Sequence, residues 1–216
     1  MCGPAGRQEA LDPFLNSLGL LVPLIPEARP RGIPAQPIKL KVTDLPALAS
    51  TLKERGCFLT EPISQHDVIY SQKSSKEEFE QSKEGDIIIR LRYLAEGAEL
   101  NLKQQRSGEM DNLEYETEVK NPAAMRDILL RLGWQSVIEV KKLRRKGKLG
   151  KYEICLDEVE GLGSFVELEM LADDDADPAA AREQLFRELE SLGLSRAAEE
   201  TKGYDTQLYQ KNLLPQ

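Results

Sequence analysis

Apolar and polar residues alternate with a period of two through much of this chain. The clearest case is the segment 150–170, where two alternating stretches are separated by Gly161 and Gly163. In the second stretch, Glu167 and Glu169 share one face of a strand, and apolar residues take the other face. Residues 150–170 therefore predict a β-hairpin that directs carboxylates to one side.

The same alternation predicts six further strands, at 38–42, 65–72, 87–92, 100–103, 113–119 and 137–145. Apolar residues at helical spacing predict three helices, at 45–55, 122–132 and 178–192. Each helix begins at a capping residue and ends near a glycine, in the pairs Asp44 and Gly56, Asn121 and Gly133, Asp177 and Gly193. A shorter helical tail is expected to end near Tyr209.

The composition is that of a soluble protein, and the predicted strands and helices indicate an α+β fold with one main domain. The chain has 216 residues, of which 40% are hydrophobic and 31% charged, enough to bury a sizeable core. Residues 1–36 are rich in proline and glycine and predict a loosely ordered extension. Residues 37–216 are expected to form a single domain.

Charge and cysteine content limit the partners and the compartment. A net charge of −8 and a pI near 5.0 argue against a protein that binds nucleic acid or an acidic membrane through its overall charge. The apolar segment 15–25 is too short to span a bilayer. The three cysteines are too few for a disulfide framework and are not spaced like metal ligands, which favours a reducing, cytoplasmic location.

Ionisable residues occupy the polar face of nearly every predicted strand, with basic strands and acidic strands separately segregated. An open sheet with one face in water explains each strand alone. The segregation as a set favours a closed eight-stranded antiparallel barrel, with the charged faces inside and the helices packed on the apolar outside. The predicted result is a tunnel with a polar lumen.

This charge pattern suits a polyanion and its metal. Guanidinium groups bind phosphate oxygens in pairs, so Arg90 with Arg92, and Lys142 with Arg144, could hold a triphosphate. Carboxylates cannot bind that anion directly, but they can hold Mg²⁺ or Mn²⁺. The ion would neutralise charge as a phosphoanhydride breaks.

Residues 38 to 209 resemble the CYTH family, the triphosphate tunnel metalloenzymes, and are most similar to its class IV adenylyl cyclase branch. The most specific part is residues 157–169, Asp-Glu-Val-Glu-Gly-Leu-Gly-Ser-Phe-Val-Glu-Leu-Glu. The resemblance implies a catalytic Lys39. It implies substrate phosphate contacts from Arg90, Arg92, Lys103, Lys142, Arg144 and Lys202. It also implies metal ligands at Glu116, Glu118, Asp157, Glu167 and Glu169.

The first strand departs from the family pattern, which normally reads Glu-x-Glu-x-Lys. Ala35 and Pro37 stand where the two glutamates are expected, whereas Lys39 is present. Either the other acids suffice for a metal, since Mg²⁺ tolerates a largely watery shell, or catalysis is impaired and anion binding survives.

Three functions follow from the resemblance. The leading hypothesis is a metal-dependent class IV adenylate cyclase that converts ATP to cyclic AMP and pyrophosphate. The second is a triphosphatase acting on inorganic or thiamine triphosphate, and the third is a non-catalytic triphosphate-binding module. The sequence leaves open the reaction, the physiological substrate, the role of residues 1–36 and the oligomeric state, for which a homodimer is one option.

Overall fold

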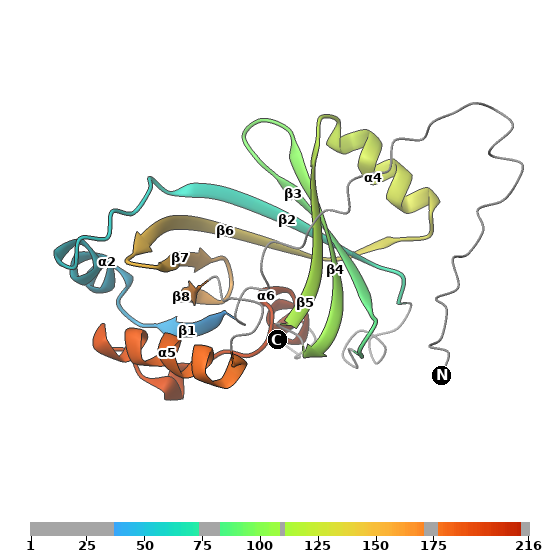
Figure 1. Cartoon of the computed structure of the whole chain (residues 1–216). Helices are drawn as coiled ribbons and strands as arrows, with labels where there is room; N and C mark the ends of the chain where they lie inside the picture. The colour runs from blue at the N-terminus through green and yellow to red at the C-terminus, as the bar shows by residue number, and fades with distance from the viewer. Residues whose placement is uncertain (1–36, 74–82, 109–110, 171–176, 213–216) are drawn as a thin grey trace, which may run out of the picture. The chain divides into compact units, whose positions relative to one another are not determined.

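The computed structural model describes residues 37–73, 83–108, 111–170 and 177–212 (Figure 1). The predicted extension at 1–36 lies outside the described residues.

Eight strands form one antiparallel sheet in the order β1-β8-β7-β6-β2-β3-β4-β5. The strands are β1 (Ile38–Val42), β2 (Ile63–Ser71), β3 (Ile87–Tyr93), β4 (Ala98–Gly108), β5 (Asp111–Val119), β6 (Gln135–Leu149), β7 (Tyr152–Val159) and β8 (Gly163–Glu169). Every predicted strand is present. The long strands β2 and β6 lie in the middle of the order and connect its two halves (Figure 1).

The expected closed ring of strands is not formed within the described residues, where β1 and β5 are the two ends of the sheet. Another segment occupies the outer edge of β1. Leu40 forms an isolated antiparallel bridge with Glu199, and the Glu200 backbone N–H donates to the Lys39 carbonyl at 2.9 Å. At these groups the outer edge of β1 is therefore paired with residues 199–200 and not with β5.

Three capped helices begin where the sequence predicts: α2 (Leu45–Glu54), α4 (Pro122–Arg131) and α5 (Pro178–Ser191). Asp44, Asn121 and Asp177 each accept a backbone hydrogen bond from the first turn of the following helix, at 2.9 to 3.1 Å. A 3₁₀ turn, η1 (Arg196–Ala198), and a last helix, α6 (Tyr204–Asn212), follow. In the described part of the chain, no helix has the length and apolar character needed to cross a membrane.

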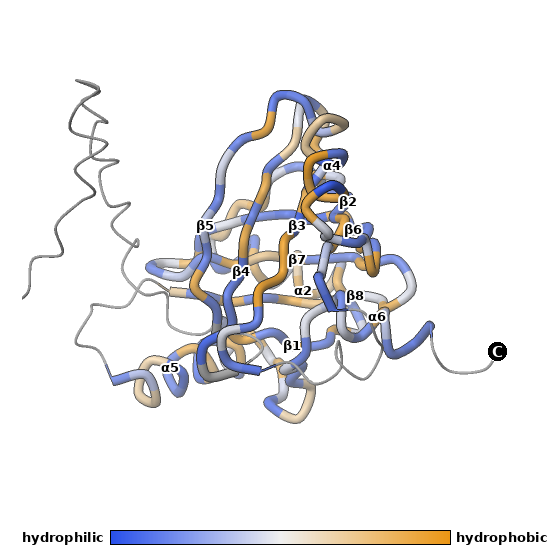
Figure 2. Tube along the Cα trace, turned by 90° about the vertical axis from the view of Figure 1, so that its right-hand side faces the viewer, coloured by the Kyte–Doolittle hydropathy of each residue, from blue (hydrophilic) through white to orange (hydrophobic). Residues whose placement is uncertain are grey.

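The apolar strand faces are covered by helices, as predicted. On one half of the sheet, Leu40 and Leu168 pack in a buried cluster with Leu185 of α5. On the other half, Leu91 of β3 packs in a second cluster with Leu129 of α4. Figure 2 shows hydrophobic and hydrophilic residues interleaved along the strands, so the opposite face of the sheet carries the charges.

Helix α6 covers one part of the charged face. Tyr204 and Leu208 form a third buried cluster with Val140, Val159 and Phe165, which share the face of the charged residues on β6, β7 and β8. The polar interior expected from the sequence is therefore closed by apolar contacts at this place.

Candidate functional site

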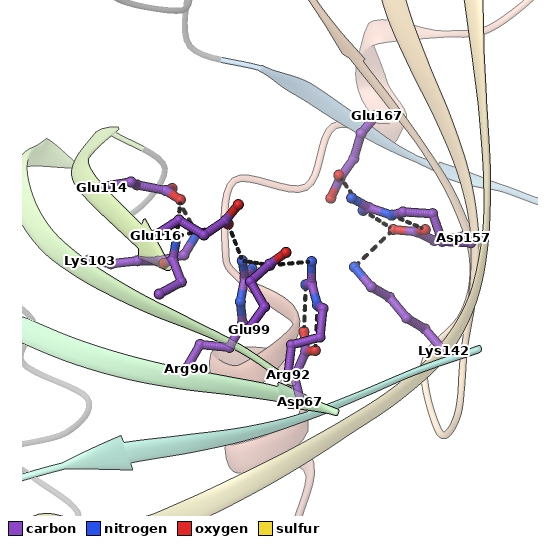
Figure 3. Close-up of polar contacts among 12 residues, drawn as sticks. Asp67, Arg90, Arg92, Glu99, Lys103, Glu114, Glu116, Lys142, Asp157 and Glu167 are labelled. Carbon is purple, nitrogen blue, oxygen red and sulfur yellow. Dashed lines mark hydrogen bonds and ion pairs between the residues drawn. The ribbon is translucent and has the colours of Figure 1, made fainter. Parts of the chain in front are cut away.

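Strand register brings most of the predicted phosphate and metal residues into two clusters on one face of the sheet (Figure 3). The first, here the Asp157 cluster, comes from β1, β6, β7, β8 and α6 and contains Lys39, Lys142, Arg144, Asp157, Glu167 and Tyr204. The second, the Arg90 cluster, comes from β2 to β5 and contains Asp67, Arg90, Arg92, Glu99, Asn101, Lys103, Glu114 and Glu116. Figure 3 shows the two sets pointing toward one another.

Asp157 is the centre of the first cluster and is fully buried. Its cross-strand partner Arg144 donates from Nε to Oδ1 at 2.7 Å and from NH2 to Oδ2. The Tyr204 hydroxyl donates to Oδ2 at 3.0 Å, and Lys142 Nζ lies 3.4 Å from the same oxygen. Four donors thus surround one carboxylate, which compensates its burial.

Burial and neighbouring charges shift the other members of this cluster. Burial, followed by the adjacent Arg144, lowers the pKa of Lys142 to about 8. Burial alone would raise the pKa of Glu167, but Arg144, whose NH2 lies 2.6 Å from Glu167 Oε2, lowers it to about 2. Burial, with Glu167 and Asp157 nearby, raises the pKa of Tyr204 well above its ordinary value, so its hydroxyl keeps its proton.

Lys39 and Lys142 both lie against the C-terminal segment. Lys39 is 2% exposed, and its Nζ donates to the Lys202 carbonyl oxygen. The ammonium groups of Lys39 and Lys142 lie 4.5 Å and 5.0 Å from the centroid of the Tyr204 ring. The side chain of Lys202 instead donates to Gln210 Oε1 at 2.9 Å, so the structure places this predicted phosphate ligand with α6.

In the second cluster, Arg92 is fixed and Arg90 is held loosely. Arg92 makes a two-pronged pair with Asp67, at 2.7 Å and 2.8 Å, and its NH1 lies 3.7 Å from Glu99. Arg90 NH2 lies 3.8 Å from Glu99 and 3.7 Å from Glu116, both beyond hydrogen-bond distance. Burial, and then the nearby Arg92, lowers the pKa of Arg90.

The far side of this cluster contains a smaller network. Lys103 Nζ donates to Glu114 Oε1 at 2.9 Å, and Asn101 Nδ2 donates to Glu114 Oε2 at 3.0 Å. Three buried polar atoms on this face, Gln65 Oε1, Arg90 Nε and Asn101 Oδ1, have no hydrogen-bond partner among the described residues. Such orphan atoms are uncommon in folded proteins and often mark the place of a ligand or water.

The predicted metal ligands differ in the partners that they have in this structure. Asp157 and Glu167 are paired with Arg144. Glu169 lies opposite Glu153 on β7, and burial together with Glu153 raises the pKa of Glu169. Glu118 is exposed and is the register partner of Glu99.

The carboxylates of β4 and β5 fit a divalent ion that arrives with a phosphate ligand. The Glu99 carboxyl is hydrogen-bonded to that of Glu116, and burial followed by Glu116 raises the pKa of Glu99. A proton or a cation stabilises such a contact. His, Cys, Asp and Glu side chains of the described ranges make no group of three or more that could hold a metal. Mg²⁺ commonly takes one or two carboxylates together with water and substrate phosphates, which this donor set can supply.

A groove of about 590 Å³ is lined by residues from both faces of the sheet, with Gln65 and Lys142 from the charged face. Its lining includes Ser64, Leu143, Glu158 and Ser164, which are register partners in one row across β2, β6, β7 and β8. Strand alternation puts this row on the face opposite the two clusters.

Sequence reasoning missed Asp67, Glu99 and Asn101 as members of the site. Glu99 and Asn101 have the strand parity of a selected residue, because they alternate with Leu100 on β4 in step with Lys103. Asp67 is on β2, where no site residue was selected. The sequence interpretation began the fourth strand at residue 100, whereas the strand begins at Ala98. Extending the alternation by one residue would have found Glu99.

Comparison with known proteins gives two curated relatives with cyclase names. A protein of Methanocaldococcus jannaschii, named as a candidate adenylate cyclase, is 27% identical over 161 residues, or 74% of this chain and 89% of that protein. Adenylate cyclase CyaB of Aeromonas hydrophila is 36% identical over 90 residues, or 42% of this chain and 46% of that protein.

Solved structures share the fold. A Vibrio parahaemolyticus protein, named as a candidate adenylate cyclase, has a TM-score of 0.67 at 20% identity, covering 80% of this chain and 95% of that one. The protein HpAC1 from Hippeastrum has a TM-score of 0.52 at 19% identity, covering 83% of this chain and 97% of that one. Residues 38–204 match the CYTH domain, which is most of the chain. The chain therefore belongs to the CYTH domain family.

Proposed function

We propose that this chain is a divalent-metal-dependent enzyme that acts on a nucleoside triphosphate, as a class IV adenylate cyclase does when it forms cyclic AMP and pyrophosphate. The observation that carries the proposal is the meeting of buried and partly buried cations from three separate strands on one face of the sheet: Lys39, Arg90, Arg92, Lys142 and Arg144. Cations gathered in this way, with partial burial, suit a polyanion of several phosphates.

In this proposal, Arg90 and Arg92 bind phosphate oxygens from β3, and Lys142 binds from β6. Asp67 holds the Arg92 guanidinium in a fixed orientation through its two hydrogen bonds. Lys142 is largely protonated below a pH of about 8, so at neutral pH it is a cation. The chain thus positions a triphosphate between the two halves of the sheet before any bond breaks.

Glu116, with Glu118 or Glu99 beside it, would hold Mg²⁺ or Mn²⁺ together with the phosphates of the substrate. The ion would neutralise the charge that develops as the phosphoanhydride breaks. Lys39 is buried beside Lys142 and the Tyr204 ring, where its ammonium adds positive potential to the same end of the site. Its catalytic role stays a prediction.

The test is product identification with the purified chain. Incubation with ATP and Mn²⁺ or Mg²⁺ should give cyclic AMP and pyrophosphate, both resolved by anion-exchange chromatography. Lys142→Ala should lose most of this activity. Lys141→Ala is the matched control, because Lys141 is exposed and alternates onto the other face of the same strand. Equal activity in the two variants would contradict the assignment of the charged face.

A second function is favoured by one comparison. The Hippeastrum protein is described as a candidate adenylyl cyclase with a dominant triphosphatase activity. If this chain behaves in that way, the assay yields orthophosphate and no cyclic nucleotide, because water replaces the ribose hydroxyl as the nucleophile. Tight tripolyphosphate binding without turnover under either metal would instead indicate a binding module, in line with the missing first-strand glutamates.

A further inference from the structure

Asn101 contains an acceptor that the described chain leaves unused. The residue is 1% exposed on β4. Its Nδ2 lies 3.0 Å from Glu114 Oε2 and 3.4 Å from Glu116 Oε2. Glu114 is paired with Lys103 as a carboxylate, which only accepts hydrogen bonds, so the reverse orientation of the amide would set oxygen against oxygen. The amide orientation is therefore fixed, and Oδ1 is left buried without a donor among the described residues.

Arg90 presents a complementary unused donor on the neighbouring strand. Arg90 and Asn101 are register partners across β3 and β4, which puts their Cβ atoms about 5 Å apart on the same face. Arg90 Nε is buried and has no acceptor among the described residues. Two cross-strand neighbours thus carry one orphan donor and one orphan acceptor on the same face, each unfavourable until a ligand pairs with it.

The two atoms together discriminate between ligand groups. An ionised phosphate oxygen can accept from Arg90 Nε, but it has no hydrogen to give to Asn101 Oδ1. A hydroxyl group can do both, since it carries one O–H donor and two lone pairs. The pair therefore fits an alcohol that lies next to the phosphates of the bound molecule.

We infer that Asn101 is a specificity-determining residue whose Oδ1 accepts a hydrogen bond from a ribose hydroxyl of a nucleoside triphosphate. This inference rests on the proposed function, because it requires a triphosphate on the adjacent cations. It goes beyond that function by separating nucleoside triphosphates from inorganic triphosphate. A site that bonds a hydroxyl discriminates against the analogue that lacks it, because the buried partner is then left unpaired.

The first experiment uses the unaltered chain and needs no variant. Isothermal titration calorimetry without divalent metal, which prevents turnover, compares ATP with 2′-deoxy, 3′-deoxy and 2′,3′-dideoxy ATP. ATP should bind about tenfold more tightly than the dideoxy compound, the effect of leaving one buried acceptor unpaired. The single deoxy compounds identify which hydroxyl is used. Equal affinity for ATP and dideoxy ATP overturns the inference.

The second experiment changes the residue. Asn101→Ala should remove the preference for ATP over dideoxy ATP while changing tripolyphosphate affinity less than about threefold. Gln104→Ala is the matched control, because Gln104 is on the same strand and alternates onto the opposite face. The control should keep the full preference. Circular dichroism before titration checks that each variant is folded. If Asn101→Ala does not fold, the comparison of ATP with dideoxy ATP on the unaltered chain tests the inference.

Two outcomes separate this inference from the proposed function. If neither ATP nor tripolyphosphate binds to the unaltered chain, the proposed function fails. If both bind and Asn101→Ala weakens them equally, the triphosphate site that the proposed function requires is retained and the hydroxyl contact is rejected. A loss that appears only when Mg²⁺ is added, and equally for tripolyphosphate, would assign Oδ1 to a metal-bound water and also overturn the inference.

Discussion

The Asp157 cluster and the Arg90 cluster lie on the same charged face, but their polar groups are satisfied to different degrees. Asp157 receives one hydrogen bond from Arg144 Nε at 2.7 Å and another from the Tyr204 hydroxyl at 3.0 Å. Arg90 has no ion pair shorter than 3.7 Å among the described residues, and its Nε is an orphan.

This difference separates two uses of similar residues. A buried carboxylate that is already surrounded by donors has little capacity left for a metal, and removing it leaves unpaired cations. A guanidinium with loose pairs can exchange them for phosphate oxygens at little cost. We therefore expect Asp157 to act mainly on stability and Arg90 mainly on binding.

The largest expected effect is the loss of stability in Asp157→Asn. The change leaves Lys142 and Arg144 without their shared buried counter-ion, which should cost about 3 to 5 kcal/mol of unfolding free energy. Urea denaturation followed by circular dichroism measures it. Glu158→Gln is the control, because Glu158 is exposed on the same strand. Normal stability with lost metal response would favour a metal-ligand role for Asp157 and break the comparison.

A smaller effect, on binding, is expected for Arg90→Ala. Loss of charge-assisted hydrogen bonds to phosphate should weaken tripolyphosphate binding by about 2 kcal/mol, or roughly thirtyfold. Calorimetry gives the affinity, with Lys141→Ala as the control. Stability should fall less than in Asp157→Asn, since the Arg90 pairs are long. If tripolyphosphate affinity were unchanged, Arg90 would not be a phosphate ligand and the comparison would fail.

Tyr204→Phe sharpens the role of helix α6. The variant keeps the ring that contacts Phe165 and the two lysines but loses the hydroxyl that donates to Asp157. Removing this buried hydrogen bond should lower the free energy of unfolding by about 1 kcal/mol or somewhat more, because the acceptor is charged. Thermal denaturation compares it with Tyr115→Phe, whose side chain is 55% exposed. Unchanged thermal stability in Tyr204→Phe would show that Arg144 and Lys142 alone supply the donors that the Asp157 carboxylate needs.

The smallest effect is expected for Glu99→Gln, which relieves the contact with Glu116. Burial and Glu116 raise the pKa of Glu99 above its ordinary 4.5. The folded chain therefore holds this proton longer than the unfolded chain, so stability falls as the pH rises from 4.5 through the raised pKa. Glu99→Gln should lose this dependence and be more stable at pH 7 by less than about 1 kcal/mol. Denaturation curves at pH 4 and pH 7 measure the difference.

The sequence was informative about local structure because local rules decide it. Two-residue alternation located all eight strands, and Asp44, Asn121 and Asp177 marked helix starts within a residue. The same alternation placed Arg90, Arg92, Lys142 and Arg144 on one face. These features depend on neighbours along the chain, so one sequence suffices to read them.

The sequence by itself thus determined the strands, the capped helices, the charged face and the resemblance to the CYTH family. Only the tertiary structure decided that Glu199 and Glu200 pair with the edge of β1 and that α6 covers part of the charged face. It also decided that the Asp157 carboxylate is surrounded by donors, whereas Arg90 Nε and Asn101 Oδ1 have no partner among the described residues. The physical reason is that pairing of polar groups depends on residues far apart in sequence, such as Asp157 with Tyr204, whose approach no local periodicity encodes.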